Sequence, residues 1–300
     1  MKKKTYLFAL MAMVLTLGSC SDNENGIGGE TSKYITVSTS IGNMTRVATD
    51  EKGGQTFEEG DEISVYAWTG DATVAPETRE RVVNNAINKL TNGSWVSTPQ
   101  MLWKNNRDKH YFIGVYPISA ISDLSAGEYT FDETKQVESD LLVAVNKDGL
   151  SYNVDEPQTV PLTFTHVMAK LAVNLTYKNQ WGGIPTVEKV VVGNAAKEAT
   201  INYLTKVVTP STTAKEDFSL PEITENTKYV SVIIPQEEVT QLTIVIGGKN
   251  FVYDNGTPFK LESGKITTVN LEVGRDEIKL GDVKITNWED GSTFSGEALN

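Results

Sequence analysis

The chain has few of the side chains that metal sites and catalytic centres require. Its 300 residues include one cysteine, Cys20, and two histidines, His110 and His166. A single cysteine excludes an intrachain disulfide, so the fold must depend on buried side chains and backbone pairing. Each histidine stands alone among strand-like residues, a setting more typical of a structural imidazole than of a metal ligand or general base. We therefore expect no metal and no cofactor.

Long hydrophobic runs are also missing. The longest apolar run, residues 6–17, is too short to cross a hydrocarbon core of about 30 Å as a helix. Because three lysines precede it and small residues follow it, residues 1–19 are predicted to be a secretory signal peptide. Leu17-Gly18-Ser19-Cys20 resembles the lipobox of bacterial lipoproteins, which implies acylation of Cys20 and anchoring in the outer membrane. An ordinary signal peptide followed by a chance cysteine is the alternative.

Positive charge is scarce. The 27 lysines and arginines face 39 aspartates and glutamates, giving a formal net charge of −12, and loss of Lys2, Lys3 and Lys4 with the signal would make it −15. Binding to a phosphate backbone depends on clustered basic residues, so nucleic acid is not an expected partner. The acidic Ser21–Glu24 resembles the export tag that carries some lipoproteins to the cell surface. A merely hydrophilic linker is the alternative.

Motifs for enzymatic chemistry are absent. The sequence contains no Gly-x-Ser-x-Gly, no phosphate-binding glycine loop and no His-Glu-x-x-His. The acidic turn at Glu58–Glu62 lacks the alternating ligands of a calcium loop and is expected to be a solvated turn. Trp95, Trp103 and Trp181 could stack on sugars, but packing within the fold is the more common role of such residues. We predict a protein that is not an enzyme.

Short alternating segments separated by Gly, Asn or Asp turns predict an all-β fold. Strands are expected at residues 35–41, 62–68, 111–116, 162–175, 187–193, 199–204, 229–235, 242–246, 265–273 and 276–288. Hairpins are expected at Asn146–Gly149 and at Gly247–Asn250. Residues 84–95 are expected to form a strand or an irregular segment that ends at Asn92-Gly93-Ser94. One short helix is the most that the pattern allows, around Glu77–Lys89, and residues 119–136 are expected to form a loop. The last strand shifts its alternation at Gly281-Asp282.

The length of the chain and the prolines Pro157 and Pro161 predict two domains with a boundary at about residue 160. After the signal peptide, a tether covers residues 20–33. An N-terminal β-sandwich is expected over residues 34–160 and a C-terminal β-sandwich over residues 161–300, the latter ending in a possible donor-strand tail.

Several segments together resemble one family. They are the lipobox, Thr45-Arg46-Val47, Phe57–Val65, Phe112–Pro117, Leu162–Leu175 with Phe164-Thr-His166 and Ala169-Lys-Leu171, and the ending Ile285-Thr-Asn-Trp288. In order and spacing they resemble the fimbrillin family, the Mfa-like type V pilus subunits of Gram-negative gut and oral anaerobes. The resemblance implies two transthyretin-like β-sandwich domains in tandem and a structural role in cell-surface fimbriae.

The resemblance also implies an assembly route. Members are exported as lipoproteins, and an Arg/Lys-specific protease cuts after the first strand, which opens a groove for a strand of the next subunit. In this chain Cys20 is then the lipid site, Arg46 the cleavage site and residues 35–41 the removed strand. Lys52 and Lys33 are alternative cleavage sites. The tail from about Asp276 is the candidate donor.

Physical reasoning supports such an exchange. Burial of an aliphatic side chain contributes about 1.5–3 kcal/mol, so losing Ile35, Val37 and Ile41 would leave a groove with an unpaired strand edge beside it. A donor could fill it by adding backbone pairs and pocket-filling side chains, here Ile278, Leu280, Val283 and Ile285. Because donor and groove are different surfaces, contacts run head to tail and build a filament.

Two functions stay open at this point. One is a stalk or tip/accessory pilin that serves adhesion and biofilm formation, and an anchor role is a further variant of it. The other is a surface lipoprotein that does not polymerise and binds glycan or host protein through its loops. An extracellular hydrolase is a distant third.

Overall fold

The computed structural model describes residues 33–42, 56–153, 155–156 and 158–288. Its bounded elements are strands apart from one 3-10 turn, η2 (Thr78–Glu80), so the predicted all-β class is confirmed. No helix within the described ranges is long and apolar enough to cross a membrane.

The first large unit is a seven-stranded sheet that nearly closes on itself. Its order is β1-β8-β7-β5-β2-β3-β4, and its two edge strands, β1 and β4, contact each other. The strands are β1 (Thr36–Ile41), β8 (Thr159–His166), β7 (Leu142–Leu150), β5 (His110–Tyr116), β2 (Glu62–Thr69), β3 (Arg81–Thr91) and β4 (Ser94–Thr98).

The rest of the chain forms three further sheets. One has the order β14 (Glu222–Thr224), β15 (Lys228–Ile233), β9 (Ala169–Tyr177), β18 (Lys265–Val273) and β19 (Ile278–Asn287). Another has the order β13 (Lys215–Ser219), β10 (Val187–Ala196), β16 (Gln236–Ile246) and β17 (Lys249–Leu261). The smallest has the order β12 (Val207–Pro210), β11 (Glu198–Asn202) and β6 (Gly127–Thr130).

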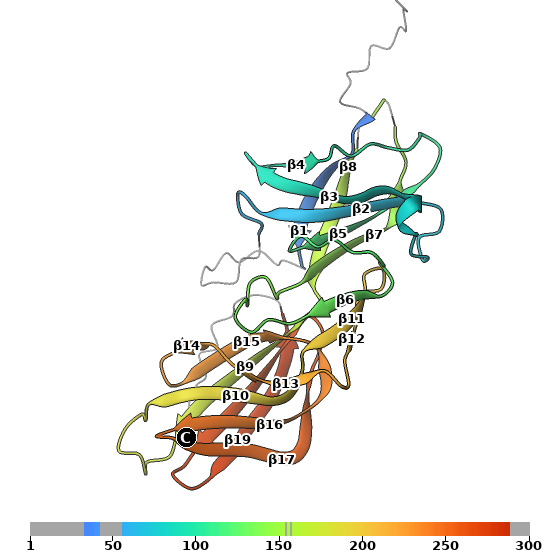
Figure 1. Ribbon diagram of the computed structural model, residues 1–300. Coiled ribbons are helices and arrows are strands. Elements are labelled where there is room, and N and C mark those ends of the chain that lie inside the picture. The colour runs from blue at the N-terminus through green and yellow to red at the C-terminus, as the bar shows by residue number, and fades with distance from the viewer. Residues whose placement is uncertain (1–32, 43–55, 154, 157, 289–300) are drawn as a thin grey trace, which may run out of the picture.

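The small sheet joins the two halves of the chain. β6 comes from the segment between β5 and β7, yet it pairs with β11 of the second half. In Figure 1 this sheet lies between the seven-stranded sheet and the larger sheets of the second half. The change of sheet along the chain falls between His166, the end of β8, and Ala169, the start of β9. The predicted change of phase near Ala169-Lys170 is therefore a crossing from one sheet to another.

Strand β2 shows how alternation builds two cores at once. Ile63, Val65 and Ala67 lie in one buried cluster, whereas Tyr66 and Trp68 lie in a second. The sequence predicted that both faces are covered, and this is confirmed. The second cluster continues through β9, β10, β16 and β18, so the outer face of the seven-stranded sheet packs with the core of the second half.

Two of the predicted turns and kinks are confirmed. Gly247 and Gly248 connect β16 to β17 as a two-residue hairpin, with positive φ of 56° and 72° as a type I′ turn requires. In the β18–β19 pair the register shifts between Asn270 and Leu271, which leaves Gly281 as an extra residue on β19.

Three local predictions were wrong. The segment considered for a helix is one 3-10 turn followed by the long strand β3, which confirms the strand expected from Asn84 as far as Thr91. A bulge with Asn85 at φ 56° interrupts the alternation near its start. The turn signal at Asn146–Gly149 marks an irregularity inside β7, opposite β5, rather than a hairpin. The expected loop at residues 119–136 contains strand β6.

Candidate functional site

Strand β1 closes the seven-stranded sheet. Its inward side chains belong to the cluster at the centre of that sheet, with Ile35 only 2% exposed, Val37 6% and Ile41 7%. These are the three residues that the sequence named as buried. Alternate residues of β1, such as Ser38 and Ser40, face solvent. The strand is therefore one-sided, with a hydrophobic face inward and a polar face outward.

The pairing of β1 with β8 is parallel and runs over six residue pairs, from Thr36 opposite Thr159 to Ile41 opposite Phe164. On its other edge β8 pairs with β7 only through residues 164–166. Within the described chain, residues 159–163 of β8 thus have β1 as their only ladder partner. Removal of β1 would leave their backbone groups, and the side chains of the cluster beneath, without cover.

A second set of contacts ties β1 to the opposite edge of the sheet. The amide of Ile35 donates to the carbonyl of Met101 at 2.9 Å, and the amide of Trp103 donates to the carbonyl of Lys33 at 3.3 Å. The indole Nε1 of Trp95 donates to Thr39 Oγ1 at 3.0 Å. β1 therefore bridges two edges, which makes it the strand whose loss would open the sheet.

An aromatic cluster lies at the end of β1. Phe57 makes edge-on contacts with Trp95, Tyr116 and Phe164, at ring-centroid distances of 5.3, 5.3 and 5.1 Å. Because these rings come from the segment before β2 and from β4, β5 and β8, they join the strands that surround β1. None of these four rings belongs to β1, so their contacts with one another do not depend on that strand.

Strand β19, the candidate donor, has a different environment. It is an edge strand that pairs with β18 through nine residue pairs. Ile278 and Leu280 are half-buried, whereas Val283 and Ile285 are each 37% exposed. The four named side chains are thus much less covered than those of β1.

A shallow groove runs along this edge. Leu280, Val283 and Ile285 of β19 face Tyr253, Pro258, Phe259 and Lys260 of β17 across a cavity of about 300 Å³. The groove lies where the outer strands of two different sheets meet. Figure 1 shows β17 and β19 as neighbours in the second half of the molecule.

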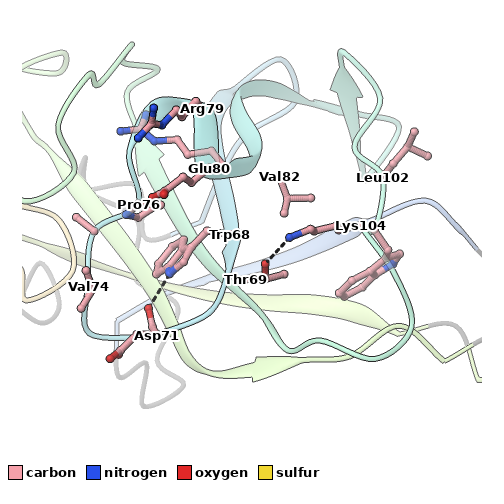
Figure 2. Close-up of a pocket in the computed structure, with 13 residues that line it drawn as sticks. Trp68, Thr69, Asp71, Val74, Pro76, Arg79, Glu80, Val82, Leu102 and Lys104 are labelled. Atoms are coloured by element: carbon pink, nitrogen blue, oxygen red, sulfur yellow. Dashed lines mark hydrogen bonds between the residues drawn. The ribbon is translucent and has the colours of Figure 1, made fainter.

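The larger cavity, about 780 Å³, lies on the seven-stranded sheet. Figure 2 shows its walls, which come from the end of β2, the turn through Asp71 and Val74, η2 with Glu80, and the segment around Leu102 and Lys104. Its chemistry is mixed, with both signs of charge around apolar side chains. The indole of Trp68 is 2% exposed and donates to the carbonyl of Asp71 at 2.9 Å, so it offers little open surface to a ligand.

Both histidines are held by the fold. His110 is buried, its Nε2 accepts from the amide of Lys104 at 3.0 Å, and its Nδ1 lies 3.1 Å from the carbonyl of Asp108. Burial lowers the pKa of His110, so the neutral imidazole is favoured. His166 Nδ1 lies 2.8 Å from Asp140 Oδ1. The described residues contain no group of three or more His, Cys, Asp or Glu side chains placed to hold a metal ion.

The tryptophans considered as sugar-stacking residues have structural partners. Trp95 bonds to β1, Trp103 packs edge-on against His110 and Phe112, and Trp181 donates to the carbonyl of Val273 at 2.9 Å. Packing within the fold accounts for all three. The carboxylates of the acidic turn also have partners within the fold. Asp61 accepts a hydrogen bond from the amide of Glu58, and Glu59 accepts one from the amide of Asn92, each at 2.7 Å.

Some predicted site residues cannot be located. Cys20, Arg46 and Lys52 lie outside the residues that the structure describes. One cluster was missed by the sequence analysis, where His166, Lys170 and Trp288 were noted in separate motifs. The structure brings them together, with the Lys170 ammonium 4.6 Å and the His166 ring 4.1 Å from the centre of the Trp288 ring system. Strand alternation contains no signal for a contact between residues so distant in sequence.

Comparison with known proteins gives one family and one fold. A family model described as fimbrillin-like matches residues 45–288. A curated protein of Bacteroides uniformis, named as a candidate fimbrium subunit, Fim1C, is 24% identical over 315 residues, with 97% of each chain covered.

Solved structures with the same fold come from related bacteria. A candidate cell adhesion protein of Bacteroides ovatus superposes with a TM-score of 0.65 at 17% identity, covering 85% of this chain and 98% of that one. A candidate cell adhesion protein of Bacteroides uniformis gives 0.64 at 19% identity, covering 85% and 99%. A fimbrial protein of Bacteroides vulgatus gives 0.52 at 12% identity, covering 84% and 99%. At these identities the likeness is one of fold.

Proposed function

Since this chain belongs to the fimbrillin-like family, we propose that it is a stalk or tip/accessory pilin of cell-surface fimbriae, assembled by protease-triggered strand exchange. Its role in the fimbria is structural and non-enzymatic and serves adhesion and biofilm formation. The similarity to the candidate fimbrium subunit of Bacteroides uniformis along 97% of both chains supports this assignment.

The observation that carries the assembly mechanism is the position of β1. It is the strand that closes the seven-stranded sheet, and it is the sole ladder partner of residues 159–163 in the described chain. Its three inward aliphatic side chains each contribute about 1.5–3 kcal/mol through burial. After loss of β1, binding of another strand with a hydrophobic face would therefore be strongly favourable in free energy.

The cut is proposed to follow Arg46, five positions after the end of β1 at Ile41. A cut there leaves β1 on the released piece and keeps β2 with the rest of the chain. Lys52 would give the same separation. Lys33 precedes β1, so a cut there would leave β1 attached.

The donor is proposed to be β19 with the tail that follows it. As an edge strand it is bound on one side only, by β18, and its apolar side chains are half-covered. A strand in this position can leave its own sheet with less loss of buried surface than an interior strand. Other subunits of the same kind are then the partners, joined head to tail.

Before cleavage the precursor is proposed to be an outer-membrane lipoprotein at the cell surface, acylated on Cys20. Two or more acyl chains hold a protein stably on a membrane. We also propose the tandem arrangement of two transthyretin-like β-sandwich domains over residues 34–160 and 161–300. The change of sheet between β8 and β9 supports two units, with the boundary at residues 166–169 instead of 160, because β8 belongs wholly to the first sheet. Strand β6 is the exception, since it pairs with β11 of the second half.

The mechanism can be tested by limited trypsin treatment of purified protein that lacks the acyl group. We expect cleavage after Arg46, found by sequencing the new amino terminus, followed by a ladder of oligomers that resists detergent. Arg46→Ala should abolish cleavage after residue 46, and Arg46→Ala combined with Lys52→Ala should abolish the ladder as well. The matched control, Arg79→Ala, changes an exposed arginine far along the chain and should leave both intact. A chain that is cut after Arg46 and stays monomeric would overturn strand exchange.

The alternative is a surface protein that binds glycan or host protein without polymerising. The cavity of Figure 2 is the feature that favours it, because about 780 Å³ is within the usual range of ligand pockets. Glycan-array binding that is lost in Trp103→Ala and kept in Trp181→Phe would support this function. Absence of binding at every glycan would count against it.

A further inference from the structure

Trp288, directly after β19, is held against the junction between β8 and β9. Its ring system stacks on the imidazole of His166 with centroids 4.1 Å apart and planes 6° from parallel. Its backbone amide donates to the carbonyl of Gly264 at 2.9 Å. The end of the edge strand is thereby fixed both by its side chain and by its backbone.

The imidazole is itself held in place. His166 Nδ1 lies 2.8 Å from Asp140 Oδ1, and the two side chains are 16% and 22% exposed. Asp140 lies just before β7, the strand that pairs with the end of β8. A hydrogen bond to a carboxylate orients an imidazole, so the ring presents a fixed face to Trp288.

Lys170 supplies the third contact. Its ammonium lies 4.6 Å from the centre of the Trp288 ring system, and burial lowers its pKa, an effect that the charge of Asp140 partly opposes. In the part of the chain that the structure describes, this ammonium has no side-chain hydrogen bond and no ion pair within 4.0 Å. The ammonium therefore lies over the indole face, and a desolvated cation gains more from such a contact than an exposed one.

His166 is the last residue of β8, the strand with which β1 pairs. Ile41 is opposite Phe164, and the amide of Gly42 donates to the carbonyl of Phe164 at 2.7 Å. Only Thr165 separates Phe164 from His166. The last residue pair between β1 and β8 thus lies two residues from His166, which holds the end of β19.

We propose that Trp288, His166, Lys170 and Asp140 form a latch that retains β19 in its own subunit until β1 leaves β8. The proposal rests on strand exchange as the assembly mechanism and assigns its regulation. Loss of β1 frees residues 159–163 of β8 and removes Ile41 and Gly42 from Phe164, two residues before His166. The end of β8 is then held by β7 and Asp140 alone, which loosens His166 and releases Trp288 with β19. A subunit that has not been cut keeps its donor strand and does not polymerise early.

The first test measures amide hydrogen exchange of the uncleaved monomer by mass spectrometry, peptide by peptide. In Trp288→Ala the amides of β19 should exchange about tenfold faster, while those of the β16–β17 hairpin keep their wild-type rates. His166→Ala removes the stacking partner, together with the bond to Asp140, and should act in the same direction, which keeps the test valid if Trp288→Ala does not fold. Lys279→Ala, an exposed change on β19 away from the latch, should alter the rates less than twofold.

Two outcomes would overturn the latch. One is unchanged exchange of β19 in both latch variants. The other is an equal rise in every peptide, which indicates general loss of stability.

The second test asks whether β1 and the latch are coupled. Ile41→Ala, which weakens the β1 contact, should speed exchange of β19 in the wild-type background and add nothing in the Trp288→Ala background. Effects that multiply in the double variant would show independent sites and overturn the coupling. Because every measurement is made on the monomer, failure of polymerisation and failure of the latch are distinguishable.

Discussion

Ile41 and Phe164 lie opposite each other in the parallel β1–β8 pair, both buried in the cluster at the centre of the seven-stranded sheet. Two parallel strands require a crossover connection. Here the connection contains the other five strands of the sheet, because β1 is the first and β8 the last of its seven strands along the chain. The first strand of the described residues thus lies at an edge, where it can be lost without breaking the pairing of any other two strands.

The contribution of β1 to stability predicts a large effect of truncating its inward side chains. Ile41→Ala in the uncleaved chain should lower the free energy of unfolding by about 2–5 kcal/mol, since it leaves a cavity beside Phe164. Ser38→Ala changes an exposed residue of the same strand and should stay within about 0.5 kcal/mol. Urea unfolding of both variants checks this. Equal effects at the two positions would mean that β1 is not buried as a one-sided strand.

His110 predicts a pH dependence of stability. Burial lowers its folded-state pKa below the unfolded value of about 6.5, so the unfolded state binds a proton more readily over the interval between the two. The contribution of His110 to the free energy of unfolding is thus fully present above about pH 6.5. It decreases as the pH falls, by at most about 1.4 kcal/mol per pH unit. Protonation of Nε2 also removes the acceptor for the amide of Lys104.

The measurement is urea unfolding between pH 5 and 8 for the wild type and His110→Gln. The difference in unfolding free energy between them should be constant above pH 7 and should shift in favour of the variant as pH falls. The acidic groups with lowered pKa values, such as Asp71 and Asp132, titrate well below this range. A difference independent of pH would contradict the burial of a neutral imidazole.

Sequence reasoning succeeded where one physical signal dominates. Alternation predicted the two faces of β2, the inward residues of β1, and the β16–β17 turn, where Gly247 and Gly248 adopt the positive φ that other residues avoid. It missed the start of β3, where a helix was allowed, because Asn85 inserts a bulge that shifts the alternation within one strand. It also failed at Asn146–Gly149, since turn residues serve irregular strands as well as hairpins.

Long-range relationships were the least predictable part of the site. The parallel partner of β1 lies more than 100 residues away, and nothing in residues 36–41 selects β8 over another strand. The meeting of Trp288 with His166 and Lys170 likewise depends on how separate sheets pack. Such contacts follow from tertiary geometry, which the period of a single strand does not encode.

The contact between the two edges of the seven-stranded sheet gives the last prediction. Trp95 Nε1 donates to Thr39 Oγ1 at 3.0 Å, linking β4 to β1. Trp95→Phe and Thr39→Val each remove one partner while keeping much of the local volume. Because both variants break the same bond, their effects should be non-additive, with a coupling free energy of about 0.5–1.5 kcal/mol in a double-mutant cycle followed by urea unfolding.

A matched cycle pairs Trp95→Phe with Thr36→Val, whose hydroxyl lies 3.2 Å from Thr159 Oγ1 on β8 and not near the indole. Its coupling should be zero within about 0.3 kcal/mol, as expected for sites without shared partners. Coupling in the first cycle alone places Thr39 against β4 in solution and identifies the bond as one that must break before β1 can leave. Coupling absent from both cycles would mean that the Trp95–Thr39 bond does not hold β1 in solution. The strand would then be retained by β8 and by the backbone bonds of Ile35 and Lys33 to Met101 and Trp103.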